Sequence, residues 1–382
     1  MEPKIRFKGF TKEWEAPTLD MICKKASSIL SENSLGGNLG KYPVYGASGY
    51  IQNITTYDFD REYVGLIKDG SGVGRSQLYP AFSSILGTMQ YILPKNDTNV
   101  SFLSYLLQTI DFSIYVTGSS IPHIYFKDYC KEVIRIPFKE EQKEIANYFK
   151  NLDSLIQSTS KKIDLLKQVK AASLQSMFPQ NGEAAPRVRF KEYAKKWETC
   201  KLNSILTERH EASTITQELP QLSFTIADGV IRPEDRKSNQ RDFLIKDKDN
   251  KRYLITRVGD IIYNPANVVY GAIHRNSLID GVVSPIYRIF YTNQDSRFIE
   301  CVVRRPSFIN QLAMRTEGTV TKLKTLKPEA FLDMTVCIPT DIEEQKAIGE
   351  YFRNLDQQII LQAKSLDKLK QIKSACLDNM FV

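Results

Sequence analysis

The chain has 382 residues, enough for two or three domains, and its 42% hydrophobic and 25% charged residues are ordinary for a globular protein. The net charge of +8 is only mildly basic, so it permits a polyanionic partner without requiring one. No apolar run approaches the roughly 18 residues of a membrane span, and the first residues lack a signal-peptide core, which together predict a cytoplasmic protein.

The chain opens with the motif P-K-I-R-F-K-G-F-T-K-E-W-E at residues 3–15. In the turn-rich stretch that follows, short runs such as 63–67 and 89–93 have the residue content of β-strands. We expect a helix over 100–113, and then a loop, a short helix and a strand over 119–137. Residues 1–136 are therefore predicted to form a first α+β domain built on an antiparallel sheet.

A long helix is predicted over residues 140–177, within a helical segment that spans 137–179. Its apolar residues are spaced alternately by four and three, which is typical of a coiled-coil seam. One polar residue, Thr159, interrupts this seam, and Pro179 follows the helix end. The seam residues are Ile145, Phe149, Leu152, Ile156, Ile163 and Leu166.

The same plan then recurs. The motif P-R-V-R-F-K-E-Y-A-K-K-W-E starts at residue 186, 183 residues after the first opening, and 180–338 are predicted to hold a linker and a second domain. A second long helix is predicted over 343–380, within 339–382, with Thr340 as its N-cap. Its seam, interrupted at Gln362, comprises Ile348, Phe352, Leu355, Ile359, Leu366 and Leu369. The expected fold is thus two α/β domains separated by two long antiparallel coiled-coil helices, with a pseudo-twofold internal repeat.

No motif in the sequence predicts a catalytic centre. The glycine stretch 70–74 lacks a following helix and a GK[ST] signature, which favours a β-turn over a cofactor loop. Residues 264–267, N-P-A-N, lack the second proline and the aromatic residue of an adenine methyltransferase motif, and 233–237 are predicted to be a charged loop. The isolated histidines and six scattered cysteines predict neither a catalytic triad, a metal site nor a disulfide framework.

The order and duplication of these segments resemble the specificity subunit of type I restriction-modification systems. The resemblance rests on the two openings, on the helix starts I-P-F-K-E-E-Q-K-E-I-A-N-Y-F and I-P-T-D-I-E-E-Q-K-A-I-G-E-Y-F, and on motifs in both domains. These motifs are Y-P-V-Y-G-A-S-G-Y-I and D-G-S-G-V-G in the first domain, and G-D-I-I-Y-N-P-A-N and D-G-V-V-S-P-I-Y in the second. Together they extend over essentially the whole chain.

The resemblance implies two target recognition domains, each reading one half of a split site in double-stranded DNA. It further implies that the two helices act as a ruler between these domains and dock two modification (methyltransferase) subunits, which restriction (endonuclease and translocase) subunits join. In such a complex this chain binds no cofactor and catalyses nothing, whereas S-adenosylmethionine, ATP and Mg belong to the partner subunits. The expected location is cytoplasmic and nucleoid-associated.

Candidate DNA contacts are polar and basic residues on predicted loops, because such side chains reach base edges and phosphates. In the first domain they are Tyr45, Ser48, Tyr50, Lys68, Ser71, Arg75, Ser119, Ser120 and His123. In the second they are Asn264, Asn267, Tyr270, His274, Arg275, Thr319, Thr321, Lys322 and Lys324, with Arg232, Arg236, Lys237, Asn239 and Arg241 as further candidates for phosphates. For docking of the modification subunits, the candidates on the helix flanks are Lys143, Asn147, Lys150, Lys346, Glu350 and Arg353.

Two other classes of protein stay open at this point. One is a coiled-coil adaptor that joins proteins without reading DNA, which the modest charge permits. The other is a methyltransferase or nuclease acting alone, which would need a catalytic motif that the sequence does not show.

The ruler hypothesis makes a direct prediction. Removing one heptad from each long helix should preserve the fold and change the spacer between the two halves of the recognised DNA site. Methylation-sensitive sequencing of a host that carries the shortened protein checks this, and an unchanged spacer would contradict the hypothesis.

Overall fold

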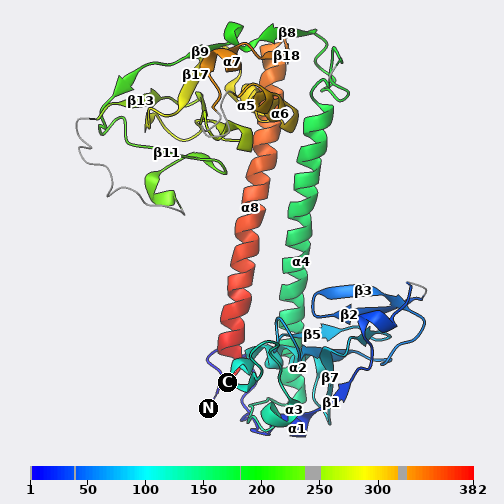
Figure 1. Cartoon of the computed structure of the whole chain (residues 1–382). Helices are drawn as coiled ribbons and strands as arrows, with labels where there is room; N and C mark the ends of the chain where they lie inside the picture. The colour runs from blue at the N-terminus through cyan, green and yellow to red at the C-terminus, as the bar shows by residue number, and fades with distance from the viewer. Residues whose placement is uncertain (1, 38–39, 181, 237–250, 317–324) are drawn as a thin grey trace. The chain divides into compact units, whose positions relative to one another are not determined.

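The computed structural model describes residues 2–37, 40–180, 182–236, 251–316 and 325–382 (Figure 1). It divides into two compact units, unit 1 with Met1–Lys161 and Ala363–Val382, and unit 2 with Lys162–Gln362. Each unit therefore contains one body, the first part of one long helix and the last part of the other. None of the described helices is long and apolar enough to cross a membrane.

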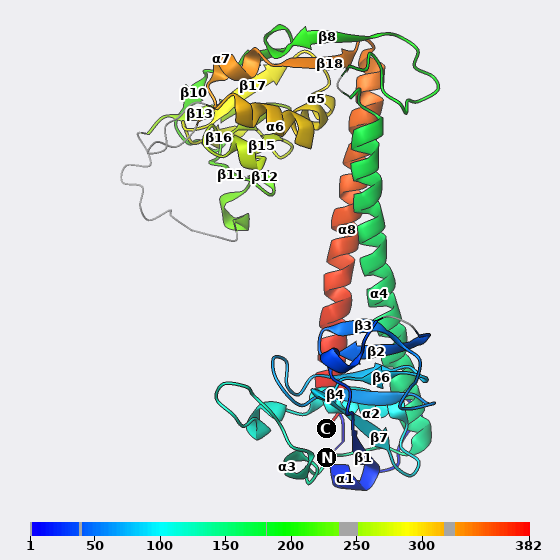
Figure 2. The same cartoon turned by 45° about the vertical axis from the view of Figure 1, so that its right-hand side comes forward.

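Unit 1 is built on an antiparallel sheet with the strand order β1-β7-β4-β5. A second sheet, of order β3-β2-β6, pairs β2 with β6 in parallel (Figure 2). The strands are β1 Cys23–Ser27, β2 Tyr42–Gly46, β3 Gly49–Ile54, β4 Tyr63–Ile67, β5 Ser76–Tyr79, β6 Ser84–Ile85 and β7 Met89–Pro94. The helices of this body are α1 Leu19–Ile22, η1 Glu32–Ser34, α2 Val100–Thr109, η2 Phe112–Tyr115 and α3 Phe126–Tyr129.

The core of unit 1 has two parts. In one, Val64, Leu66 and Ile92 from the first sheet pack in the same cluster as Phe102 of α2 and Phe149 of the long helix. In the other, aromatic side chains including Tyr63, Tyr79 and Tyr91 pack together, with Tyr63 and Tyr91 edge to face at 4.8 Å. Strands 63–67 and 89–94 are so thoroughly buried because both faces of this sheet are covered.

Unit 2 has a four-stranded antiparallel sheet of order β15-β14-β17-β9, together with smaller sheets β10-β13-β16, β11-β12 and β18-β8. The strands are β8 Trp197–Lys201, β9 Leu206–Glu208, β10 Ala212–Ser213, β11 Ser223–Thr225, β12 Gly229–Ile231, β13 Tyr253–Thr256, β14 Ile261–Tyr263, β15 Ile273–Arg275, β16 Gly281–Val283, β17 Arg288–Thr292 and β18 Thr335–Pro339. Its helices are η3 Leu202–Ser204, η4 Pro233–Asp235, η6 Val268–Tyr270, α5 Ser296–Val303, α6 Pro306–Met314 and α7 Pro328–Leu332.

The two predicted long helices are confirmed as α4 Lys139–Ser176 and α8 Ile342–Met380. Within unit 1 the start of α4 lies against the end of α8, with Lys373 Nζ 2.6 Å from Asp153. Within unit 2 the counterparts Lys170 and Asp356 form the same ion pair at 2.5 Å. Since Asp356 follows Asp153, and Lys373 follows Lys170, by 203 residues, the internal repeat extends to individual contacts.

A buried ion pair ties each opening motif to the start of its long helix. Arg6 donates to both carboxylate oxygens of Glu141, at 2.8 and 2.9 Å, and Arg189 donates to both oxygens of Glu344 at 2.6 Å. The Glu344 side chain is fully buried, and the carboxylate raises the pKa of Arg189 by accepting its hydrogen bonds. The shared R-F and E-E-Q motifs of the sequence are therefore structural.

The glutamine that follows each of these glutamates binds two further segments. Gln142 donates to the carbonyl of Pro137 at 2.9 Å and accepts the N–H of Asn99, the N-cap of α2, at 2.9 Å. Gln345 repeats this arrangement with Pro339 and with Asp295, the N-cap of α5. One turn of each long helix thus fixes both the segment that precedes the helix and a helix of the body.

Three local predictions need correction. The helix expected over 100–113 ends at Thr109 because Asp111 starts a separate 3-10 turn. The cap of α8 is Asp341, whose carboxylate accepts the N–H of Glu343, while the hydroxyl of Thr340 donates to Lys196. The strand expected before the first long helix is reduced to isolated bridges at Val133 and Ile136.

The seam of the long helices also has a second role. Ile145 and Phe149 belong to the core cluster of the unit 1 body, and Ile348 and Phe352 to that of unit 2. The first turns of each helix therefore pack into the body of their unit as well as along the other helix. Further along α4, Leu155 is 53% exposed.

The buried pair gives a stability prediction for unit 2. Replacing Arg189 by Ala leaves the buried Glu344 carboxylate without a cation and with the 3.3 Å hydrogen bond from Trp197 Nε1, so we expect a loss of about 3 kcal/mol in the free energy of unfolding. Urea unfolding in a Trp14→Phe background measures it, because Trp197 then reports on unit 2 alone. The double change Arg189→Ala with Glu344→Gln should recover part of the loss, since no buried charge is left.

The matched control is Arg187→Ala, which removes a guanidinium that is 70% exposed and paired within its own loop to Glu183. Its unfolding midpoint should stay close to that of the parent protein. Equal losses for Arg187→Ala and Arg189→Ala would contradict the special role of the buried pair.

Candidate nucleic-acid interface

The two four-stranded sheets are topologically equivalent. Reading both orders in the same direction, β1, β7, β4 and β5 of unit 1 correspond to β9, β17, β14 and β15 of unit 2. The connection 68–75 between β4 and β5 therefore matches the connection 264–272 between β14 and β15. We call these connections tip 1 and tip 2. They carry Lys68, Ser71 and Arg75, and Asn264, Asn267 and Tyr270, all of which the sequence proposed as DNA contacts.

Tip 1 lies beside the other two candidate loops of its unit. Ser48 in the β2–β3 turn lines one cavity together with Ser71 and Arg75. The loop that holds Ser119, Ser120 and His123 is joined to tip 1 by a hydrogen bond from Gly70 N to Pro122 O of 2.8 Å and by a bridge between Asp69 and His123. The structure thus brings together tip 1, Ser48 and the loop of Ser119, Ser120 and His123, whereas Tyr45 packs against Tyr79 and Tyr50 on the second sheet.

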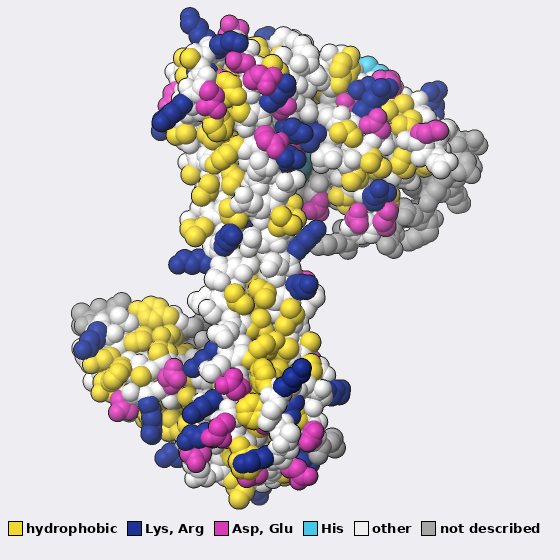
Figure 3. Space-filling view, turned by 180° about the vertical axis from the view of Figure 1, so that it is seen from behind, with side chains coloured by type: hydrophobic (Ala, Val, Ile, Leu, Met, Phe, Trp, Pro, Cys, Tyr) yellow, Lys and Arg dark blue, Asp and Glu magenta, His cyan; other side chains and the backbone are white. Residues whose placement is uncertain are grey.

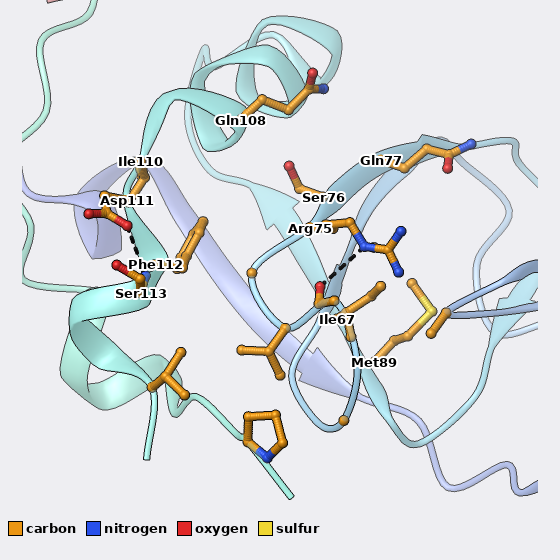
Figure 4. A pocket seen from close by; sticks show the side chains of 18 of the residues that line it. Ile67, Arg75, Ser76, Gln77, Met89, Gln108, Ile110, Asp111, Phe112 and Ser113 are labelled. Atoms are coloured by element: carbon orange, nitrogen blue, oxygen red, sulfur yellow. Dashed lines mark hydrogen bonds between the residues drawn. The ribbon is translucent and has the colours of Figure 1, made fainter. Parts of the chain in front are cut away.

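A cavity of about 730 Å³ borders tip 1 on its other side (Figure 4). Its polar lining includes Arg75, Gln77, Gln108 and Asp111, and its apolar lining includes Phe112. No sequence signal indicates that Gln77, Gln108 and Asp111 line this cavity, since they come from β5, from α2 and from the loop after α2.

The glycines 70–74 form the end of a β-hairpin, as the sequence predicted, and no helix follows them directly. Gly70, Gly72 and Gly74 have φ near +86°, +85° and +86°, a region that other residues rarely adopt. The hairpin closes through hydrogen bonds of 2.9 Å from Ile67 N to Arg75 O and from Gly74 N to Ile67 O.

Tip 2 has the same place in its sheet but different side chains. Asn264 Oδ1 accepts the N–H of Ala266 at 3.0 Å, so part of this amide stabilises the turn itself. Tyr270 is 72% exposed at the end of the tip. Leu326 N donates to Pro265 O at 3.0 Å, in the same way that Ile124 N donates to Lys68 O in unit 1.

Two candidates of unit 2 are not placed for direct contact with bases. His274 is 4% exposed, and its Nε2 lies 2.8 Å from the carbonyl of Ile226. Burial lowers the pKa of His274 to about 4, so the ring is neutral at pH 7. Arg275 is largely buried with its Nε 3.7 Å from Glu300, and burial lowers its pKa. Both residues stabilise the packing of β15 against α5.

The remaining candidates of unit 2 divide by position. Arg232 and Arg236 are exposed at the two ends of the 3-10 turn η4. The others lie outside the described residues, namely Lys237, Asn239, Arg241, Thr319, Thr321, Lys322 and Lys324.

The surface charge is mixed. On the face drawn in Figure 3, Lys and Arg side chains are interspersed with Asp and Glu. At tip 1, Lys68 lies 3.3 Å from Asp69 and is neutralised by it. The described part of tip 1 therefore carries opposite charges side by side rather than a cluster of cations.

The residues proposed for docking lie on the exposed side of the helix starts. Lys143, Asn147 and Lys150 are spaced by four and three and are all exposed, which places them on one face of α4. On α8, Lys346 pairs with Glu343 at 2.8 Å, while Glu350 pairs with Arg353 and, at 3.6 Å, with Arg297. The exposed faces of α4 and α8 thus carry basic residues at the same repeat positions. They differ at one position, where α4 has Asn147 and α8 has Glu350.

This architecture can be compared with known proteins. The model of the type I restriction modification DNA specificity domain matches residues 11–168. The specificity subunit of the type I restriction enzyme MjaVIII from Methanocaldococcus jannaschii is 22% identical over 338 residues, covering 82% of this chain and 76% of that protein. In these two comparisons the chain is similar to specificity subunits of type I restriction-modification systems.

The fold of the chain is similar to that of a solved specificity subunit. The crystal structure of a type I restriction-modification S subunit from M. genitalium aligns with a TM-score of 0.67 over 100% of this chain and 99% of that one, at 15% identity. The family model covers the unit 1 body and most of α4. The equivalent sheet of unit 2 extends the same plan through the second repeat.

The buried histidine gives a prediction on pH. Because its folded pKa of about 4 lies below the ordinary value of 6.5, the unfolded chain takes up the proton first as the pH falls. Stability of unit 2 is therefore complete above pH 6.5 and decreases between pH 6.5 and 4, by on the order of 2–3 kcal/mol.

Urea unfolding followed by Trp197 in a Trp14→Phe background measures this slope, and an NMR titration of the His274 ring measures its pKa directly. The variant His274→Gln retains an N–H donor near Ile226 but cannot gain the proton, so its stability should change less over this range. A His274 ring that titrates near 6.5 in the folded protein would contradict the prediction.

Proposed function

We propose that this chain is the DNA-reading subunit of a type I restriction-modification complex, in which each unit reads one half of a bipartite site. The observation that carries the proposal is the pairing of a constant framework with different tips. The two sheets have equivalent strand orders and the helix starts share their contacts, yet the exposed side chains of the tips differ, with Arg75 on tip 1 and Tyr270 on tip 2. Such an arrangement suits two readers of different half-sites.

In the proposed complex, two modification subunits dock on the long helices and restriction subunits join them. The exposed basic positions Lys143 and Lys150 on α4, and their counterparts Lys346 and Arg353 on α8, support equivalent docking of two identical partners. Catalysis, S-adenosylmethionine, ATP and Mg²⁺ are assigned to those partner subunits. The complex acts on DNA in the cytoplasm, at the nucleoid.

The experiment is expression of the chain with its modification subunits in a host free of adenine methylation, followed by methylome sequencing. We expect one bipartite motif with a fixed spacer. The purified complex should bind DNA with this motif and lose affinity when either half is scrambled, because each unit contributes its own contacts.

The controls separate the other two classes of protein. If the modification subunits methylate the same motif without this chain, it is an adaptor rather than a reader. If the isolated chain transfers methyl groups from S-adenosylmethionine, it is an enzyme acting alone. Either outcome would contradict the proposal.

A further inference from the structure

Arg75 is an exposed cation at the base of the tip 1 loop, directly before β5. Tip 1 is held by backbone hydrogen bonds on three sides, to Ile67 across the hairpin, to Thr88 before β7 and to Pro122 in the neighbouring loop. Arg75 N also donates to Gly72 O at 3.0 Å within the turn. A side chain on such a framework loses little conformational entropy when it binds.

Gly72 positions the guanidinium itself. A Cβ atom on this residue would lie 2.2 Å from Arg75 Nη2 and 2.3 Å from Nε, so the side chain lies directly against the glycine backbone. Nε is 3.4 Å from Gly72 O, which is a weak contact. Gly72 is thus needed for its positive φ and for the space that the arginine occupies.

The terminal nitrogens of Arg75 are available to a ligand. Among the described residues, no carboxylate forms an ion pair with Arg75, although Asp69 pairs with the nearby Lys68. Figure 4 shows the guanidinium pointing away from Asp111 and Ser113. Arg75 lines two cavities of unit 1, with volumes of about 730 and 670 Å³.

We propose that Arg75 determines specificity by reading a guanine in the half-site of unit 1. Its paired N–H groups would donate to O6 and N7 in the major groove, the bidentate geometry that a guanidinium makes with guanine. The inference rests on the proposed function and adds the base that is read.

The local charge favours a base over a phosphate. Phosphate binding gains from several unneutralised cations together. Here Lys68 is paired with Asp69, and the cavities that Arg75 borders are also lined by Glu32 and Asp111. Arg75 is therefore a single cation whose neighbours have little net charge and whose side chain is held in one direction. Such a side chain is better suited to contact the edge of one base than the phosphates of the DNA backbone.

Tip 2 provides an internal comparison. Its residues 264–272 have the sequence N-P-A-N-V-V-Y-G-A, which contains no Lys or Arg. The exposed Tyr270 can contact DNA but cannot make the paired donation to guanine. Guanine reading by a hairpin tip is therefore confined to the half-site of unit 1.

The test uses the reconstituted complex with modification subunits and DNA carrying its methylated motif. Each guanine of the unit 1 half-site is replaced in turn by 7-deazaguanine, which lacks N7, or by inosine, which retains O6 and N7. At one position, 7-deazaguanine should weaken binding by the wild-type complex about 10-fold, whereas inosine should leave it nearly unchanged. Arg75→Ala should weaken binding to the natural site about 10- to 100-fold and should be insensitive to 7-deazaguanine at that position.

Two variants complete the experiment. Arg75→Lys retains the charge but not the paired geometry, so it should bind like Arg75→Ala rather than like the wild type. Tyr270→Ala should alter discrimination in the other half-site and leave the response to 7-deazaguanine intact. Because Arg75 is exposed, its substitution should not change the unfolding midpoint, which is measured alongside.

Three results would overturn the inference. These are a unit 1 half-site without guanine, binding that is insensitive to 7-deazaguanine at every position, and a uniform loss of affinity for all sequences with a smaller salt dependence in Arg75→Ala. The last result would identify a phosphate contact. Failure of the wild-type complex to methylate any bipartite motif would instead contradict the proposed function, so the two failures are distinguishable.

Discussion

The buried carboxylate at the start of each long helix is the constraint on which the two units depend. Removing Glu141 or Glu344 from water costs several kcal/mol unless a cation compensates, and in both repeats an arginine from the opening motif donates to both oxygens. The position is favourable because a negative charge is stabilised at a helix N-terminus. Since the adjacent glutamine binds the cap of α2 or α5, each body has one defined orientation on the start of its helix.

A framework held in this way leaves the tips free to differ. Tip 1 and tip 2 are stabilised mainly by hydrogen bonds between backbone atoms, which place few demands on the outward side chains. Replacing Arg75 or Tyr270 by another residue therefore alters what is presented to a ligand without opening the core. This separation of framework and reader explains how equivalent sheets can carry an arginine in one unit and a tyrosine in the other.

The sequence was sufficient for the parts that repeat and insufficient for those that do not. The long helices could be predicted because their apolar spacing is regular and their offset of 203 residues is constant. The equivalence of tip 1 and tip 2 could not, since their sequences share no motif and the match emerges only from the strand order. Because His274 and Arg275 are polar residues next to a turn, the sequence pattern predicts them as DNA contacts. Their burial depends on Glu300 and Ile226, which are distant along the chain.

The Met-Phe pair at the end of each long helix shows why the repeat is interlocked. Met380 and Phe381 belong to the core cluster of unit 1, and Met177 and Phe178 to that of unit 2, so each body completes its core with the helix end of the other repeat. Correspondingly, Ile5 N donates to Asn379 O and Val188 N donates to Ser176 O, both at 2.9 Å.

Each body consequently packs against equivalent residues of a starting helix and of an ending helix. A starting helix always supplies the phenylalanine of the Y-F motif, Phe149 or Phe352, and an ending helix always supplies Met-Phe. The residues that the two repeats share are thus the residues with which each body is fixed to its two helix ends.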